Sequence, residues 1–400
     1  MRSSLRLSVL TLFFASAGTV AAACNGTPSP GSTDAGGLGD GGTTPSSEAG
    51  TPDSGATPRD AGSPEDAFIP HDAGSPDTSV SPSGDAAVDA MAPADAGSDA
   101  GGDGGFVVET DAGTFTASNW MGAFPGSTSV ADLSVPGTHD TGATIDMAGT
   151  TGTTKCQNLT VAEQLAAGVR YFDIRVQNLS NQFEVYHLTV DQQLSFASVL
   201  ESVSTFLSAN PTETLIMSVK EETPDPQTKS TNSFEQTFDT YTAQNPSLWY
   251  LDDTIPTLAQ ARGKIVLLRR FSAATTPTGI DVTAWNSEAQ TTFTIANGDA
   301  TLQIQDDYQI TDDGSKWTAI TGLFTSALQP DAGADVFFLN NTSAYMELDS
   351  GLEDILSVSN VINPELASYF TSASPGRYGV VGMDFVDTTK AWLVLRTNFR

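Results

Sequence analysis

The stretch Val169-Arg-Tyr-Phe-Asp-Ile-Arg175 joins a short apolar run to an acidic and a basic residue at its end. Nearly continuous apolar runs are expected for parallel β-strands that are buried on both faces. Similar runs alternate with segments of helical period along the chain, which predicts parallel β/α units. Eight such strands within residues 115–400 fit an α/β fold with a (β/α)8 barrel of the TIM type. The predicted strands are Asp132–Pro136, Val169–Val176, Phe183–Tyr186, Thr214–Val219, Lys264–Leu268, Thr301–Gln305, Val336–Leu339 and Gly379–Met383.

Helical periods lie between these strands. Apolar residues that fall on one helical face run from Phe196 to Leu207 and from Trp317 to Leu328. The pair Asn363-Pro364 predicts the start of a further helix, because proline is tolerated in a first helical turn.

Polar and charged side chains stand at the C-terminal ends of most of the predicted strands. In barrels of this type the active site lies at that face. The chain has three histidines, and two of them belong to this set. The strand-end residues are His139, Asp140, Asp173, Arg175, His187, Lys220, Arg269, Arg270, Asp306 and Asp384.

Two imidazoles and a guanidinium form a set suited to phosphodiester cleavage. One histidine can activate the nucleophile, the other can protonate the leaving oxygen, and Arg175 can offset charge on the phosphoryl oxygens. Asp173 can orient Arg175. Lys220 predicts contact with a ligand or a carboxylate, because an unpaired buried amine is costly. Asp384 either orients a histidine, as in a catalytic triad, or caps the next helix.

We predict no metal ion and no other cofactor. A metal site needs a cluster of carboxylates and histidines, whereas the residue two positions after Asp173 is the cation Arg175. The sequence contains neither a glycine-rich phosphate loop nor a serine nucleophile motif. Acidic residues elsewhere leave a metal-dependent enzyme open as an alternative.

At these strand ends the chain resembles the bacterial phosphatidylinositol-specific phospholipases C, of the X-domain-type phosphodiesterase superfamily. The resemblance runs from Asn119-Trp-Met121 to the C-terminus. It implies a distorted barrel and a phosphatidylinositol diacylglycerol-lyase that releases diacylglycerol and forms inositol 1,2-cyclic phosphate. The motifs that carry it are Ser134-Val-Pro-Gly-Thr-His-Asp-Thr-Gly142, Phe172-Asp-Ile-Arg175, Leu215-Ile-Met-Ser-Val-Lys-Glu221, Ala261-Arg-Gly-Lys-Ile-Val-Leu-Leu-Arg-Arg-Phe271, Ile304-Gln-Asp-Asp-Tyr308 and Val361-Ile-Asn-Pro-Glu365.

The resemblance also implies roles for single residues. His139 corresponds to the general base that takes the proton of the inositol 2-hydroxyl, and Asp384 to the carboxylate that orients this base. His187 corresponds to the general acid for the leaving oxygen, assisted by Asp140. Arg175 occupies the position that stabilises the phosphoryl charge. The supporting and inositol-contacting positions correspond to Asp173, Lys220, Arg270, Asp306 and Tyr308, and the ring of Tyr308 packs on the inositol.

Residues 1–24 predict a signal peptide of the lipoprotein type. A basic start precedes an apolar run from Leu7 to Val20, which is too short to span a bilayer comfortably. Cys24 follows three alanines, so we predict that it is lipidated and becomes the first residue of the mature protein. Plain secretion after cleavage near Ala23 is the alternative.

Residues 25–114 predict a disordered linker. They are rich in Gly, Ala, Pro and Asp and almost free of aromatic residues, so they bury too little apolar surface to offset the entropy of ordering. The segment either lifts the domain off a membrane or is a simple spacer, and we favour a spacer. The formal net charge of −31 argues against nucleic acid as a partner and gives no attraction to anionic membranes.

One departure from the family concerns the membrane. Its secreted members carry exposed aromatic residues after the first histidine motif, whereas Ala143–Thr154 contains neither Trp nor Phe. Trp249 or Trp285 could serve instead, although core packing is the expected role of both. We therefore expect an exported monomer, either secreted or anchored by lipid at the cell surface or outer membrane. Its expected substrate is a phosphoinositide or an inositol phosphate: phosphatidylinositol, a glycosylated anchor or soluble glycerophosphoinositol.

Two other functions remain as alternatives. A metal-dependent glycerophosphodiester or sphingolipid phosphodiesterase would use the same barrel, but Arg175 argues against it. A tethered module that binds inositol glycans without turnover would suit the acidic stalk. Binding alone, however, does not require a base and an acid on opposite sides of a phosphate.

Overall fold

The computed structural model describes residues 106–111, 113–222, 230–285, 292–298, 300–329 and 336–399. The predicted signal peptide, Cys24 and residues 25–105 of the predicted linker lie outside these residues. The linker prediction extended to residue 114, but strands β1 (Val107–Thr110) and β2 (Gly113–Thr116) pair across that boundary. The ring of Phe106 also stacks on Trp392, with centroids 4.7 Å apart. The folded domain therefore begins earlier in the chain than the sequence predicted.

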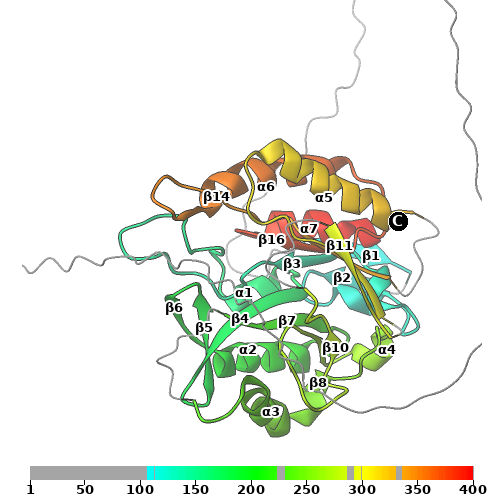
Figure 1. Cartoon of the computed structure of the whole chain (residues 1–400). Coiled ribbons are helices and arrows are strands. Elements are labelled where there is room, and N and C mark those ends of the chain that lie inside the picture. Colours follow the sequence, from blue (N-terminus) through cyan, green and yellow to red (C-terminus); the bar gives the residue numbers. More distant parts are fainter. Residues whose placement is uncertain are drawn as a thin grey trace, which may run out of the picture. The chain divides into compact units, whose positions relative to one another are not determined.

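Eight parallel strands form a curled sheet at the centre of the described domain (Figure 1). Their order is β10-β9-β7-β4-β3-β16-β13-β12, and β11 pairs antiparallel with β12 at the edge. This arrangement confirms the predicted α/β barrel-type fold. The strands are β3 (Val135–Thr138), β4 (Tyr171–Leu179), β7 (Leu215–Glu221), β9 (Ile265–Arg269), β10 (Ile280–Asp281), β11 (Thr292–Asn297), β12 (Ala300–Gln305), β13 (Val336–Asn341) and β16 (Val380–Met383), and the short β8 (Trp249–Tyr250) pairs with the start of β9.

The barrel is distorted because, within the described residues, no strand ladder joins β10 to β11. Side chains bridge this opening instead. Asn297, at the end of β11, donates its Nδ2 to the carbonyl oxygen of Asp281 in β10 at 3.0 Å. Trp285, just after β10, packs on Phe293 of β11 with ring centroids 6.5 Å apart.

The predicted strand Phe183–Tyr186 is not a barrel strand. It belongs to β5 (Gln182–His187), which pairs antiparallel with the end of β4 and with β6 (Val190–Ser195). The chain reverses at Ser180 and Asn181, both of which have positive φ, and asparagine tolerates this region better than most residues. The reversal brings His187 back toward the level of Arg175. The sequence therefore predicted the wrong strand pairing for this segment but the correct edge of the sheet for His187.

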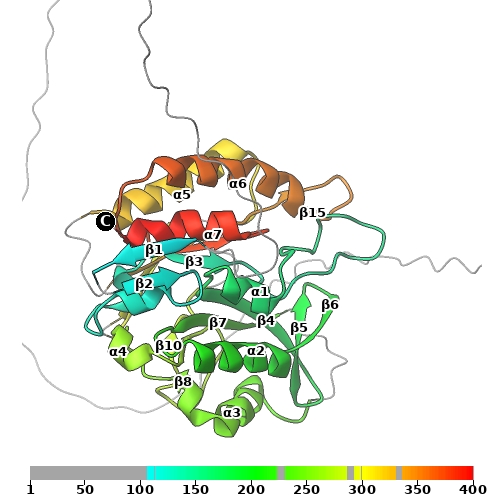
Figure 2. The same ribbon diagram turned by 180° about the vertical axis from the view of Figure 1, so that it is seen from behind.

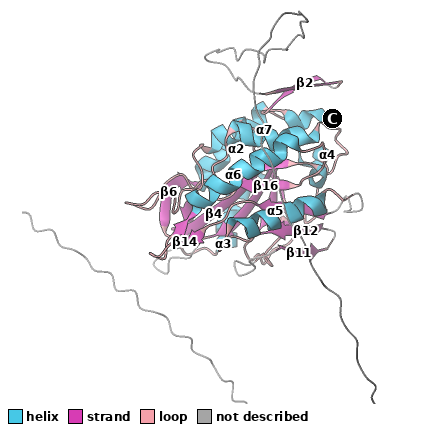
Figure 3. Cartoon of the chain, turned by 90° about the horizontal axis from the view of Figure 1, so that it is seen from above, coloured by secondary structure: helices cyan, strands magenta, loops and turns pink. Residues whose placement is uncertain are grey.

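Seven α-helices are described, and they cover the outer face of the sheet (Figures 2 and 3). The apolar face predicted from Phe196 to Leu207 lies in α2, where four of its residues are buried. The helix predicted to begin at Asn363-Pro364 instead begins at Ile355, and Pro364 lies inside it. Pro364 removes one backbone donor, but Asn360, whose carbonyl loses it, is exposed to water. The helices are α1 (Val161–Ala166), α2 (Phe196–Ala209), α3 (Phe234–Gln244), α4 (Leu258–Ala261), α5 (Asp313–Ala327), α6 (Ile355–Ser372) and α7 (Thr388–Leu395).

The central strands are buried on both faces, as their apolar runs predicted. In β7, Leu215, Met217 and Val219 pack outward in the cluster shared with the helices. Ile216 points to the opposite face and joins a second cluster inside the barrel. Both clusters hold the strand ends in fixed register, which is the basis for placing polar side chains at one rim.

A buried ion pair lies at the opposite, N-terminal end of these strands. Nε of Arg170, just before β4, donates to Glu213 at 3.0 Å, and its other nitrogens donate to four backbone carbonyls. Burial lowers the pKa of Arg170 and raises that of Glu213, although their mutual attraction opposes both shifts. The pair therefore belongs to the structural end of the barrel, away from the histidines.

None of the described helices is both long enough and apolar enough to cross a membrane.

Candidate active site

The polar strand ends meet around one pocket of about 300 Å³. Of the ten predicted catalytic and substrate-binding residues, eight line it, and the other two, Asp140 and Asp173, contact Arg175 beside it. Arg269, which the strand-end pattern included, points elsewhere and pairs with Asp281 at 2.6 Å. A larger cavity of about 670 Å³ beside α6 is lined by none of these ten residues. The eight lining residues are His139, Arg175, His187, Lys220, Arg270, Asp306, Tyr308 and Asp384.

Sharp backbone turns follow three of these side chains. Asp140, Leu188 and Phe385 come directly after His139, His187 and Asp384, and their φ angles are 40°, 52° and 47°. Left-handed backbone is uncommon for residues other than glycine and tends to occur at functional sites. Each turn ends its strand abruptly, so the preceding side chain is left at the rim.

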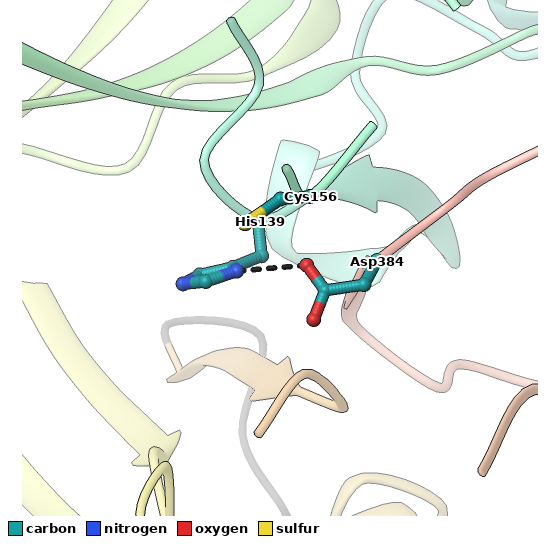
Figure 4. Close-up of side chains that lie close together, drawn as sticks. All are labelled: His139, Cys156 and Asp384. Atoms are coloured by element: carbon teal, nitrogen blue, oxygen red, sulfur yellow. Dashed lines mark hydrogen bonds and ion pairs between the residues drawn. The ribbon is translucent and has the colours of Figure 1, made fainter. Parts of the chain in front are cut away.

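His139 lies between a carboxylate and a guanidinium. Its Nδ1 is 2.9 Å from Oδ1 of Asp384 (Figure 4), and its Nε2 is 2.8 Å from Nη2 of Arg175. An ionised carboxylate only accepts, so we assign the hydrogen to Nδ1 and the lone pair to Nε2. Burial is the largest single effect and lowers the pKa of His139, but the charge and hydrogen bond of Asp384 together with the charge of Asp140 outweigh it, and the net shift is upward. The ring is therefore a neutral base of raised proton affinity.

His187 also donates from Nδ1, but its Nε2 has partners of a different kind from the guanidinium that contacts Nε2 of His139. Its Nδ1 is 2.7 Å from the backbone oxygen of Thr154, so Nδ1 carries a hydrogen. Its Nε2 faces two carboxylates, with Oδ2 of Asp140 at 3.5 Å and Oε2 of Glu353 at 3.7 Å. A ring with a hydrogen bonded at one nitrogen and negative charge at the other is suited to carry a second proton.

The loop that orients His187 is held by a single carboxylate. Asp146 accepts hydrogen bonds from the backbone N–H groups of residues 152 to 155 at 2.8–3.1 Å. Burial raises the pKa of Asp146, but these four donors outweigh it and lower the pKa overall. The carbonyl of Thr154, which receives Nδ1 of His187, is part of this turn.

Arg175 links the two histidines: it contacts His139 directly, and it reaches His187 through the carboxylate of Asp140. Its Nη1 lies 3.0 Å from Asp140, and its Nε donates to Asp173 at 3.1 Å. Burial would lower the pKa of Arg175, but Asp140 and Asp173 raise it well above its ordinary value. Burial would likewise raise the pKa of Asp173, and Arg175 and Arg270 lower it strongly. The guanidinium is thus a permanent positive charge in the lining of the pocket.

The far wall of the pocket carries the residues predicted to contact inositol. The guanidinium of Arg270 lies over the ring of Trp285 at 3.7 Å, and Nε1 of Trp285 donates to Asp306 at 2.7 Å. Lys220 is 3.7 Å from Glu222, and the ring of Tyr308 lies beside Tyr345 with centroids 6.1 Å apart. This wall offers several charged donors and acceptors, which suits a ligand with many hydroxyl groups.

Sequence reasoning missed seven residues that line the pocket, and three of them are ionisable: Glu222, Tyr345 and Glu353. Glu222 directly follows β7, two positions after Lys220, so the same strand-end rule could have found it. Tyr345 and Glu353 carry no such signal, because they belong to a small separate hairpin of β14 (Met346–Glu347) and β15 (Glu353–Asp354): Tyr345 directly precedes β14, and Glu353 is the first residue of β15. Trp285, predicted to pack in the core or to bind membrane, is buried and positions Arg270 and Asp306.

Donor atoms in this site are close enough to hold a metal ion. Three groups of histidine, cysteine and carboxylate atoms lie within 4.8 Å of one another. The guanidinium of Arg175, however, contacts both Asp140 and the Nε2 of His139, so a divalent ion would compete with a resident positive charge. The groups are His139, Cys156 and Asp384 (Figure 4); Asp140, Cys156 and His187; and His139, Asp140 and Asp173.

Comparison with known proteins gives this arrangement its context. Residues 133–271 match the family described as phosphatidylinositol-specific phospholipase C, X domain. The chain is 30% identical over 284 residues to a 1-phosphatidylinositol phosphodiesterase of Staphylococcus aureus (strain Newman), an alignment that covers 68% of this chain and 89% of that protein. The chain belongs to the bacterial phosphatidylinositol-specific phospholipase C family. A Listeria monocytogenes 1-phosphatidylinositol phosphodiesterase is also 30% identical, over 292 residues, with 71% and 86% of the two chains covered.

Solved structures of the phosphatidylinositol-specific phospholipase C family share the fold. A mutant of the Staphylococcus aureus enzyme superposes with a TM-score of 0.63 at 27% identity and covers 70% of this chain and 97% of that chain. The Listeria monocytogenes enzyme superposes with a TM-score of 0.56 at 27% identity, with 72% and 100% covered. The distorted barrel implied by the sequence resemblance is confirmed.

Within the part of the chain that the structure describes, the two tryptophans considered for membrane contact are buried. Trp249 and Trp285 are both about 5% exposed or less, so neither can insert into a bilayer as the structure stands. Core packing, the expected role of both, is what the structure shows. Leu348, on the turn between β14 and β15, is one of the few large apolar side chains that are exposed among the described residues.

Proposed function

We propose that this protein cleaves the phosphodiester of phosphatidylinositol without a metal ion, giving diacylglycerol and inositol 1,2-cyclic phosphate. The observation that carries the proposal is the contrast at Nε2 of the two histidines, both of which carry a hydrogen on Nδ1: a guanidinium faces this nitrogen in His139 and two carboxylates face it in His187. His139 presents a lone pair at Nε2, and His187 is arranged to hold a proton at Nε2. Membership in the phosphatidylinositol-specific phospholipase C family supports the same reaction.

In the proposed first step the inositol 2-oxygen attacks phosphorus. Nε2 of His139 takes the proton of the 2-hydroxyl, and the bond from phosphorus to the diacylglycerol oxygen breaks. Nε2 of His187, with Asp140 beside it, gives its proton to that oxygen. Arg175 stabilises the negative charge on the phosphoryl oxygens, and Asp384 stabilises the imidazolium that forms on His139.

In the slower second step water opens the cyclic phosphate. His187, now neutral, takes a proton from water, and His139 returns its proton to the 2-oxygen, so both rings recover their starting states. The proposed inositol contacts are Lys220, Arg270 and Asp306, with the ring of Tyr308 against the inositol ring. Asp173 holds Arg175 and Arg270 in place from below.

The test uses the full chain and phosphatidylinositol in mixed micelles with excess EDTA. We expect inositol 1,2-cyclic phosphate to accumulate first and inositol 1-phosphate later, followed by phosphorus NMR. The variants His139→Ala and His187→Ala are each expected to lose turnover by at least about 100-fold. Loss of wild-type turnover in chelator would overturn the metal-free mechanism, and binding of inositol glycans with no turnover would establish a binding module instead.

We further propose that residues 1–24 direct export, that Cys24 is lipidated, and that residues 25–105 space a monomeric domain from the membrane. The basis is the apolar run that ends in three alanines and a cysteine. Metabolic labelling with a fatty acid tests the anchor. Label is expected in the wild-type chain and not in Cys24→Ala, and label in neither protein would favour plain secretion.

A further inference from the structure

A second cavity of about 320 Å³ adjoins the active-site pocket. Leu188, Tyr345 and Glu353 line both spaces, so the two are neighbours at the side of His187. The second cavity lies between the β14–β15 hairpin and the loop of residues 147 to 154, which run beside each other (Figure 2). Nothing in the proposed chemistry so far uses this space.

The two cavities are lined by different parts of the proposed machinery. The first contains Lys220, Arg270 and Asp306, the proposed inositol contacts. The second begins at Glu353, whose Oε2 is 3.7 Å from Nε2 of His187. Because Nε2 of His187 protonates the leaving oxygen in the proposed reaction, the alcohol attached to that oxygen must extend into the second cavity.

We propose that this cavity is the leaving-group subsite and that it accepts a small uncharged alcohol with a neighbouring hydroxyl, such as the glycerol unit of glycerophosphoinositol. This inference rests on the proposed function. A leaving oxygen at hydrogen-bonding distance from Nε2 of His187 puts a vicinal hydroxyl within reach of Glu353. The carboxyl of Glu353 is largely buried, so its hydrogen bond to a ligand is made with little competing water.

The chemistry of the walls selects the alcohol. Met147, Leu188 and Leu352 supply apolar surface for a carbon backbone, and Tyr345 closes one side. Glu347 and Glu353 are the charged groups of the lining, and both are acidic. A leaving alcohol that carries a carboxylate is therefore repelled, whereas a neutral polyol is not.

The experiment compares inositol 1-phosphate esters of glycerol, methanol and glycerate on the full chain. Methanol cannot reach the second cavity, and glycerate adds one negative charge. For the wild-type protein we expect kcat/KM for the glycerol ester to exceed that of each of the other two by about tenfold. Leu352→Trp fills the cavity and should bring the glycerol-to-methanol ratio close to one.

Leu348→Trp is the matched control, because Leu348 lies on the same hairpin turn but is exposed and outside the lining. Its ratio should equal that of the wild type. Equal kcat/KM for the glycerol and methanol esters, or a ratio that Leu352→Trp leaves unchanged, would overturn the subsite, as would cleavage of phosphatidylinositol with no cleavage of either neutral ester. If the wild-type protein cleaves none of these substrates, the proposed function itself fails.

Discussion

Nη2 of Arg175 lies 2.8 Å from Nε2 of His139, so the proposed cation covers the proposed base in the free protein. A substrate phosphate carries negative charge that attracts the guanidinium toward its own oxygens. The same movement uncovers the lone pair of His139. Binding of the phosphate and release of the base are thus coupled through one side chain.

This coupling makes Arg175→Lys a strong test of geometry against charge. Lysine keeps the positive charge but not the planar fork that contacts Asp140, Asp173 and His139 together. We expect kcat/KM to fall by about 100–1,000-fold, measured with phosphatidylinositol in mixed micelles. Arg377→Lys, far from the pocket, is the control, and a loss of similar size in both variants would contradict a specific role for Arg175.

Asp384→Asn should change the pH dependence of the reaction. The charge of Asp384 raises the pKa of His139, so its removal lowers that pKa. The acidic limb of the kcat/KM profile, which follows protonation of the base, should move to lower pH. The plateau should fall by about 100-fold, because the imidazolium loses its stabilising partner. An acidic limb that stays in place or moves to higher pH would rule out His139 as the base.

Asp173→Asn should reduce stability in a pH-dependent way. Arg175 and Arg270 hold the pKa of Asp173 below its ordinary value of 3.8, so its ionised form stabilises the fold above that pH, and the contribution is lost as pH falls toward the folded-state pKa. We expect the variant to lose about 3 kcal/mol at pH 7, measured by urea unfolding. The difference from the wild type should shrink below about pH 4; a constant difference across pH would argue against an ionised Asp173.

Glu213→Gln tests the opposite end of the barrel. The change leaves the charge of Arg170 buried without its partner, and we expect unfolding free energy to fall by about 3–5 kcal/mol. The pocket lies at the other end of the strands, so kcat per folded molecule should stay at the wild-type value. A variant that keeps its stability but loses kcat would contradict a purely structural role for the Arg170–Glu213 pair, because it would show that this end of the barrel affects the pocket at the other end.

Much of the fold and of the candidate site could be predicted because strand ends are a local signal. An apolar run that stops at a polar residue predicts both the strand and the rim position, as for Arg175, Lys220 and Asp384. The rest depends on tertiary contacts. Tyr345 and Glu353 reach the pocket from a two-residue strand pair outside the barrel, and nothing in their neighbouring sequence marks them.

The same limit explains the errors in the fold. The run Phe183–Tyr186 has the composition of a barrel strand, but the two positive φ angles at residues 180 and 181 turn it back on β4. Pro364 resembled a helix start because sequence alone does not reveal that Asn360, whose carbonyl is left without its helical donor, is an exposed residue. In both places a backbone detail decided between two structures that the side-chain pattern allowed.

The turn around Asp146 has a consequence for the cost of catalysis. Four backbone N–H groups close on one carboxylate, and the carbonyl they shape holds Nδ1 of His187. The ring direction is therefore set while the chain folds, and a substrate meets an acid whose orientational entropy has already been lost. Asp146 has no proposed contact with the phosphate or the inositol, yet it sets the orientation of His187 before any ligand binds.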